Sequence, residues 1–261
     1  MNEYIELKKY YENLPEHKPE KIIFEILCKL QATLKANKGN EIFLSEADFQ
    51  FCFAQELDKA LKNKGIEQPK IILEYPYSFK QTCKKGRAFI DLYFKFNSVN
   101  YFIEFKYKLT SILDMNNKDI FLKRYNNFFT IKSQGASNNG RYLIYQDIER
   151  MEKIKLEYAN TDTEACKSYV IFITNDSQYW RINQKESCKS YNYPLADKMK
   201  IEKWCKNLER TNTKCYKEFK ECSYSSLNID NNYLINWYDF ISLCGKKNND
   251  FRILIIDCNN K

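Results

Sequence analysis

Three charged side chains interrupt two apolar segments in the stretch GRAFIDLYFKFNSVNYFIEFKYK, residues 86–108. They are Asp91 in the first segment, and Glu104 and Lys106 in the second. Successive residues of a strand point to opposite faces of the sheet. The three charges therefore point away from the apolar faces of their strands. Two carboxylates and an ammonium group on one face are a set that can bind a cation and assist a hydrolysis.

The turn between the two segments decides whether these charges meet. A turn formed by NSVN, residues 97–100, places Asp91 directly opposite Lys106 and leaves Glu104 on the diagonal. Diagonal neighbours in an antiparallel pair lie about 7 Å apart, which is close enough to share one ion. We therefore expect the three side chains to meet at one point.

Two carboxylates at this distance repel each other unless a proton or a cation lies between them. A hard divalent cation, Mg²⁺ or Mn²⁺, is bound by one or two carboxylates together with water and phosphate oxygens of a substrate. Such a metal lowers the pKa of its bound water and stabilises charge on a phosphate. Lys106 would then orient or help to deprotonate the attacking water, or stabilise the developing negative charge. The alternative is an amphipathic hairpin with a cross-strand ion pair.

The Glu-x-Lys spacing is weak evidence by itself. An acidic residue precedes a lysine by two positions four times in the chain, and the tripeptide EFK recurs at residues 218–220. What sets Glu104 and Lys106 apart is their apolar, strand-like surroundings and the acidic residue Asp91 on the neighbouring strand.

The apolar periodicity predicts the elements that must position these residues. Ser45 is expected to cap a helix, and the order through the middle of the chain is helix, three strands, helix, strand. A hairpin followed by a helical crossover implies an α/β fold, with a mixed sheet flanked by helices. The expected helices cover residues 17–36, 45–63 and 140–158, and the expected strands 70–77, 88–96, 101–108, 168–176 and 251–258, with a short strand in NNFFTIKS.

Asp91 followed by Glu104-Phe105-Lys106, within that order of elements, resembles the PD-(D/E)XK nuclease superfamily of restriction enzymes, junction resolvases and repair nucleases. The resemblance covers about residues 43–180. The phrases SEADFQ, QGASNNGRY, DIERME and TNDSQYW look like those of uncharacterised bacterial members. The chain departs from the family pattern in having isoleucine, not proline, before the aspartate.

The resemblance implies a single restriction-endonuclease-like domain over residues 1–261, with an αβββαβ core and extra helices at both ends. It implies that Asp91, Glu104 and the Phe105 carbonyl bind Mg²⁺ or Mn²⁺, and that Lys106 is the catalytic lysine. The expected function is a Mg²⁺-dependent DNA endonuclease, active in restriction, repair or defence. The alternatives are a catalytically inactive module that binds nucleic acid or protein, and a metal-dependent enzyme for another phosphate substrate.

Three further polar residues are candidates for a supporting role. Glu46 on the helix that Ser45 caps either supports the metal site, as in similar nucleases, or is an acid placed near the helix dipole. Gln50 lies one turn further on, at the edge of the apolar stripe. Glu74 interrupts the apolar strand KIILEYPY and either approaches the site or is an edge-strand charge.

The formal net charge of +8 favours an acidic partner such as nucleic acid. Basic residues gather around the hairpin, and two polar residues belong to the family-like phrases. Each is either a nucleic-acid contact or part of a solvated face or structural ion pair. A homodimer is possible for an enzyme that cuts both strands. The expected nucleic-acid contacts are Lys84, Lys85, Arg87, Lys108, Gln134 and Arg141.

No apolar run approaches the length of a membrane span, and the charged N-terminus lacks the apolar core of a signal peptide. The ten cysteines are scattered without a CxxC pair, and His17 is the only histidine, so the sequence does not predict a zinc site. We expect a cytoplasmic protein with reduced thiols and no membrane partner.

Overall fold

A computed structural model gives the arrangement of most of the chain. The elements are numbered in chain order. The structure describes residues 5–36, 41–77, 88–114, 116–125, 127–133, 137–161, 165–182, 193–201, 204–205, 227–243 and 248–259.

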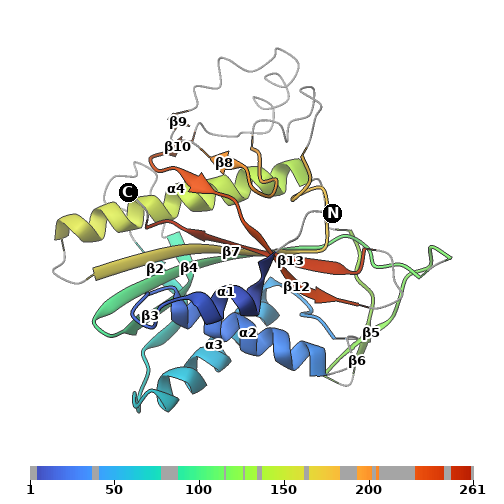
Figure 1. Cartoon of the computed structure of the whole chain (residues 1–261), viewed down its shortest axis with the longest axis horizontal. Helices are drawn as coiled ribbons and strands as arrows, with labels where there is room; N and C mark the ends of the chain where they lie inside the picture. The colour runs from blue at the N-terminus through green and yellow to red at the C-terminus, as the bar shows by residue number, and fades with distance from the viewer. Residues whose placement is uncertain are drawn as a thin grey trace.

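A seven-stranded mixed sheet forms the centre of the fold (Figure 1). Its strand order is β1-β12-β13-β7-β4-β3-β2. The β4–β7 and β1–β12 pairs are parallel, and the other pairs are antiparallel. The strands are β1 (Ile5–Glu6), β2 (Ile71–Tyr77), β3 (Ala88–Phe96), β4 (Val99–Lys108), β7 (Ala165–Thr174), β12 (Trp237–Ser242) and β13 (Asp250–Asp257).

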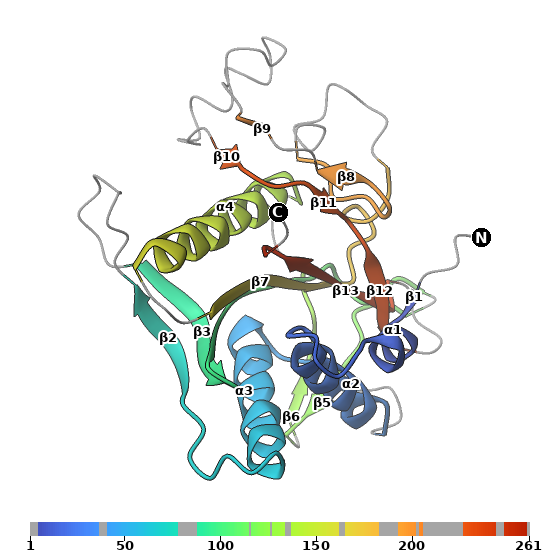
Figure 2. The ribbon, with the colours of Figure 1, turned by 60° about the vertical axis from the view of Figure 1, so that its left-hand side comes forward.

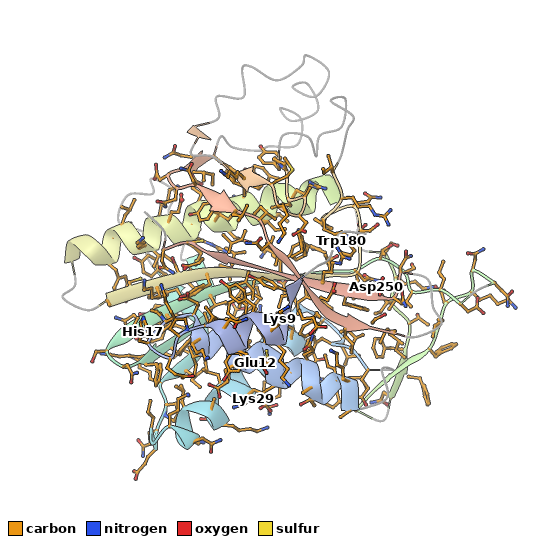
Figure 3. All side chains as sticks on the ribbon, in the orientation of Figure 1. Lys9, Glu12, His17, Lys29, Trp180 and Asp250 are labelled. Carbon is orange, nitrogen blue, oxygen red and sulfur yellow. The ribbon has the colours of Figure 1, made fainter. Side chains whose placement is uncertain are left out.

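Helices cover both faces of this sheet (Figure 2). The helices α1 (Leu7–Asn13), α2 (Lys21–Ala36) and α3 (Glu46–Asn63) lie on one face, and α4 (Ser137–Thr161) lies on the other. Each face has its own buried apolar cluster, and side chains fill the space between sheet and helices on both sides (Figure 3). The predicted α/β architecture with a mixed sheet between helices is confirmed.

The two central strands, β4 and β7, are buried on both faces. Such strands read as nearly continuous apolar runs, because neither face meets water. Residues 168–174 of β7 are all buried, as the sequence SYVIFIT predicts. In β4 the only charged residue that is fully buried is Glu104, which is 1% exposed. A buried carboxylate in an otherwise apolar strand therefore needs a specific partner.

The predicted helices and strands of the central region are present. Ser45 caps α3, and its Oγ accepts a hydrogen bond from the Asp48 backbone N–H at 3.1 Å. Helix, three strands, helix and strand follow one another in the expected order, with the small hairpin of β5 (Leu122–Arg124) and β6 (Asn127–Phe129) before α4.

The predicted helices of the C-terminal part do not occur in its described residues, and residues 183–192 and 206–226 lie outside the described part. Within the described residues after 182 the regular elements are strands, and the final strand is the predicted one. None of the helices in the described parts of the chain is both long and apolar enough to cross a membrane. The short strands of this part are β8 (Lys200–Ile201), β9 (Trp204–Cys205), β10 (Asn228–Ile229) and β11 (Tyr233–Leu234).

The predicted hairpin register is wrong by two residues along β4. Phe96 pairs with Val99, so the turn consists of Asn97 and Ser98 rather than a wider loop. Both turn residues have positive φ, 49° and 59°, which is the pattern of a type I′ turn. This turn matches the twist of the flanking strands, and that advantage outweighs the cost of a left-handed serine.

Replacing Ser98 with glycine is expected to raise the free energy of unfolding by about 1 kcal/mol. Glycine adopts positive φ without the steric penalty that an L side chain meets. The measurement is urea denaturation of both proteins. Ser98→Val serves as the opposite case and should destabilise the hairpin. If both variants unfold at the same urea concentration as the parent chain, the turn is not the one described here.

Candidate active site

The pairing between β3 and β4 ends where the charged residues begin. The last pair in the ladder is Leu92 with Ile103, whereas β4 stays paired with β7 as far as Lys108. Backbone N–H groups of β4 beyond Ile103 on the β3 side therefore need other acceptors. Two carboxylates supply them, one from β3 and one from α3.

Asp91 of β3 and Glu46 of α3 are these two acceptors. The Phe105 N–H donates to Asp91 Oδ2 at 2.7 Å, and the Tyr107 N–H donates to Glu46 Oε2 at 2.8 Å. Glu46 therefore lies against β4, next to the predicted site. Both carboxylates lie along one edge of β4. They bind the N–H groups of the residues directly before and after Lys106.

A local kink in the sheet allows Asp91 to make this contact. Ile90 packs with the α4 cluster, whereas Leu92 packs with the α2–α3 cluster, so the alternation of β3 changes at Asp91. Regular strand alternation, on which the sequence prediction for Asp91 depends, would put Ile90 and Leu92 on one face, and this is wrong at Asp91. The Asp91 carboxylate turns along the sheet toward β4 instead of projecting from one face.

The register also changes which charge lies across from Asp91. The pair Leu92–Ile103 continues to Asp91 opposite Glu104, not opposite Lys106 as the sequence predicted. Both residues of β4 alternate with the buried Phe105, so they point to the α4 side of the sheet. Asp91 thus lies across from the Glu104 end of β4 and not across from Lys106.

Helix α4 adds two charged residues that complete an ion-pair network. Arg150 Nη2 lies 2.5 Å from Glu104 Oε2 and 2.8 Å from Asp147 Oδ1. Asp147 Oδ2 lies 3.1 Å from Lys106 Nζ. Charges alternate along the chain of contacts from Glu104 through Arg150 and Asp147 to Lys106.

Glu104 is the most unusual member of this network. Its side chain is 1% exposed, and Oε1 has no hydrogen-bond partner among the described residues. Burial raises the pKa of Glu104 well above its ordinary value, and Asp91 and Asp147 raise it further. Arg150 lowers this pKa, but by less than burial raises it, although the two side chains are in close contact. The ion pair with Arg150 therefore compensates only part of the cost of burying the Glu104 carboxylate.

The Lys106 ammonium group is held from two sides. It lies against Asp147 and donates to the Phe105 carbonyl oxygen at 3.2 Å. Burial alone would lower the pKa of Lys106, but the surrounding carboxylates of Asp147, Glu46 and others outweigh burial and raise it. The lysine is therefore a cation in this environment.

Burial raises the pKa of Glu46 as well, while Lys106 and the Tyr107 N–H lower it. Gln50, one turn further along α3, is 8% exposed and makes no hydrogen bond to another described residue. The structure therefore brings Glu46, but not the Gln50 amide, into contact with β4.

Glu74 lies on the edge strand β2 and is exposed. The pairs Leu73–Leu92 and Tyr75–Ile90 bracket it opposite Asp91, at the same kink. Its φ of 51° is in the left-handed region, which is uncommon for a residue with a side chain. The position is next to the site, and no contact joins the Glu74 carboxylate to the other charged residues described.

The predicted nucleic-acid contacts are only partly within the described residues. Lys84, Lys85, Arg87 and Gln134 lie outside them. Lys108 is half-buried at the end of β4. Arg141 is 2% exposed and donates to the Tyr193 carbonyl at 3.2 Å and to the Gln178 carbonyl, so it ties α4 to the loop beyond β7 instead of facing a partner.

The groups that could bind a metal cation are contacted by positively charged side chains of the protein itself. Within the described residues, no three side chains of the usual metal-ligating types are arranged to hold one metal ion. Arg150 contacts the Glu104 carboxylate, and Lys106 contacts the Phe105 carbonyl. These are two of the ligands that the family resemblance implies for Mg²⁺, and carboxylate oxygens such as the unpartnered Glu104 Oε1 are a type of ligand that hard cations prefer.

Asp147 and Arg150 belong to the phrase DIERME, for which the sequence allows either nucleic-acid contacts or structural ion pairs, and the structure places both in ion pairs. They lie three residues apart on α4 and next to the buried Ile148 and Met151. Polar residues beside an apolar stripe indicate either a rim charge or a buried partner. The choice depends on Glu104, which lies far away in the sequence.

The chain was compared with known proteins at the level of families, single proteins and structures. No protein-family model, no curated protein and no solved structure matches the chain. A functional conclusion must therefore come from the geometry and charges of the residues around β4.

Proposed function

We propose that the chain is a metal-dependent nuclease of the PD-(D/E)XK type, which hydrolyses phosphodiester bonds of DNA. One observation carries the proposal. Asp91, Glu104 and Lys106 converge where the β3–β4 ladder opens, and one Glu104 oxygen is buried without a partner. The order of α3, β2, β3, β4, α4 and β7 is consistent with that family.

The residues present fit a hard divalent cation. Asp91, Glu104 and the Phe105 carbonyl would hold Mg²⁺ or Mn²⁺, because carboxylate and carbonyl oxygens are the ligands these ions prefer. The metal would supply a water of lowered pKa and charge stabilisation on a phosphate. Glu104 would exchange its contact with Arg150 for the metal, and the Phe105 carbonyl would exchange its contact with Lys106.

The remaining residues have roles that follow from their charges. Lys106 is held as a cation by neighbouring carboxylates, which favours stabilisation of negative charge over proton abstraction. Asp147 fixes the Lys106 ammonium through its 3.1 Å contact. Glu46 holds the Tyr107 N–H and thus the backbone on the far side of Lys106.

A second candidate function is a catalytically inactive module that binds nucleic acid or protein. It is favoured by the closed network itself, because Arg150 and Lys106 already neutralise Glu104 and Asp147. In this case the ion pairs would be structural, and no divalent cation would bind at Glu104.

Mg²⁺- or Mn²⁺-dependent cleavage of plasmid, linear duplex and single-stranded DNA, and of RNA, tests the proposal. We expect the parent chain to cleave at least one of these, and EDTA to stop the reaction. Asp91→Asn and Glu104→Gln should each reduce the rate by at least about 100-fold, since each removes a charged metal ligand.

Metal binding measured by calorimetry separates the two candidate functions. The nuclease should bind Mn²⁺ with an affinity that falls at least about tenfold in Glu104→Gln. Lys153→Gln on α4 is a suitable control, because Lys153 contacts Glu149 on the same helix and is 46% exposed. If Mn²⁺ binds equally to the parent chain and to Glu104→Gln, the metal site lies elsewhere.

A further inference from the structure

A cavity of about 300 Å³ lies where strands β12 and β13 separate. The last pair of that ladder is Trp237 with Leu254, whereas β13 stays paired with β7 as far as Asp257. The volume is at the lower end of the range for small-molecule sites. None of the described residues in the cavity wall belongs to the charged network around β4.

Aromatic rings form a large part of the cavity wall. The ring centroids of Tyr10 and Phe24 lie 4.7 Å apart, and that of Tyr238 lies 5.2 Å from the first and 5.6 Å from the second. Aromatic rings attract a cation through the negative potential of their faces. The aromatic residues in the wall are Tyr10, Phe24, Tyr169, Tyr233 and Tyr238.

Two carboxylates in the same wall lack a cationic partner among the described residues. Glu20 directly precedes α2 and makes no ion pair or side-chain hydrogen bond with a described residue, so its counter-charge there is about half a charge from the helix N-terminus. Asp257 accepts hydrogen bonds from the Asn259 backbone N–H at 3.0 Å and from the Asn259 side-chain amide. Burial raises the pKa of Asp257, these hydrogen bonds lower it, and Glu20 raises it by more than Lys167 lowers it. The cavity is therefore negative, although the chain has a formal net charge of +8.

Tyr169 adds a buried hydroxyl group beside these carboxylates. It lies directly opposite Asp257 in the β7–β13 pair, so both side chains lie on the same face of the sheet. The Tyr169 side chain is 0% exposed, and its hydroxyl has no hydrogen-bond partner among the described residues. Burial raises the pKa of Tyr169, and Asp257 and Glu20 raise it further, so the hydroxyl stays neutral within electrostatic reach of both. It therefore cannot balance their charge.

We propose that this cavity binds a small organic cation that carries a methylated ammonium group. A methylated ammonium has few N–H donors, so it needs few acceptors in an aromatic wall, whereas a primary ammonium brings three donors. Glu20 and Asp257 balance the charge of the ligand, and the aromatic rings contact its methyl groups. Both acidic side chains are half-buried, so solvent reaches this end of the cavity. The site goes beyond the proposed nuclease function and does not depend on it.

Isothermal titration calorimetry of the full chain with choline tests the proposal, and two matched molecules serve as comparisons. Dimethylbutanol has the shape of choline with carbon in place of the charged nitrogen, and ethanolamine keeps the charge but lacks the methyl groups. We expect choline to bind at least about tenfold more tightly than either. If dimethylbutanol or ethanolamine binds as tightly as choline, or if none of the three binds, the proposed ligand class is wrong.

Variants of the cavity wall locate the site. Glu20→Gln should weaken choline binding about tenfold, because it removes one of the two charges that face the ligand. It breaks no side-chain contact with a described residue, so we expect it to fold. Asp58→Asn is the matched control, because Asp58 pairs with Lys62 on α3 and is not part of the cavity wall. If choline binds equally to Glu20→Gln and to Asp58→Asn, it binds elsewhere and the inference is wrong.

Phe24→Leu separates the effect of the aromatic wall from that of charge. Leucine keeps an apolar side chain but removes one ring, so this variant should lose affinity for choline and not for dimethylbutanol. An unchanged choline affinity would remove the rings from the site. A chain that binds choline in this pattern but cleaves no DNA would overturn the proposed nuclease and leave the cation site in place.

Discussion

The Lys106→Met variant is expected to lose DNA cleavage by about 10²–10⁴-fold while it keeps its fold. Among the described residues, Lys106 is the cation that contacts the Phe105 carbonyl, and neighbouring carboxylates keep it protonated. Methionine fills a similar volume but carries no positive charge, so it cannot stabilise the negative charge that develops on the phosphate. Initial rates of Mg²⁺-dependent cleavage measure the effect.

The fold should survive this change because Asp147 keeps its second partner, Arg150. Circular dichroism and a thermal melt check that expectation. Lys153→Met is the control for removal of a lysine that contacts only Glu149. A Lys106→Met enzyme that cleaves DNA at the parental rate would remove Lys106 from the mechanism, and a variant that unfolds would identify Lys106 as a structural residue.

Glu104→Gln and Arg150→Gln are expected to change stability in opposite directions. Glu104 is a buried carboxylate with one unpartnered oxygen, and burial raises its pKa well above the ordinary value. At neutral pH its charge therefore opposes folding, so Glu104→Gln should raise the free energy of unfolding by about 1–2 kcal/mol. Arg150 retains Asp147 as its counter-ion in that variant.

Arg150→Gln should instead lower the free energy of unfolding by about 3 kcal/mol, because it leaves Glu104 and Asp147 without their shared cation. Urea denaturation at pH 7 measures both effects. Lys153→Gln should change stability by less than about 1 kcal/mol, as expected for an exposed pair. Equal destabilisation by Glu104→Gln and Arg150→Gln would show that Glu104 is held for stability and not for binding a cation.

Strand alternation placed Glu104 and Lys106 on one face of β4, as the structure also has them. The apolar runs around Glu104 and Lys106 are typical of a buried strand, and their side chains point to one face as the period of two requires. The cap at Ser45 and the apolar stripe of α4 were equally visible, because they depend on residues close together in the sequence.

The register could not be predicted because it depends on backbone conformation at two residues. NSVN permits a turn at several positions, and neither Asn97 nor Ser98 is a glycine that would mark positive φ. The kink at Asp91 was hidden for a similar reason. It involves Glu74 on the neighbouring strand and changes which residues share a face.

The partners of the charged residues were the least predictable part. The β5–β6 hairpin and the first turns of α4 separate Glu104 from Asp147 and Arg150 in the sequence. The contact of Arg150 with Glu104 therefore forms only when α4 packs on the sheet. The contact between Glu46 and the Tyr107 N–H likewise depends on where α3 crosses the end of β4. In the sequence, such long-range contacts are visible only as a polar residue beside an apolar stripe.

A crystal structure grown with Mn²⁺ tests the central claim most directly. We expect an anomalous scattering peak between the carboxylates of Asp91 and Glu104, with the Phe105 carbonyl as a further ligand. The Glu104 carboxylate should have exchanged Arg150 for the metal. A map without a peak at this position, in which Glu104 still contacts Arg150, would contradict a metal-dependent active site at the opening of the β3–β4 ladder.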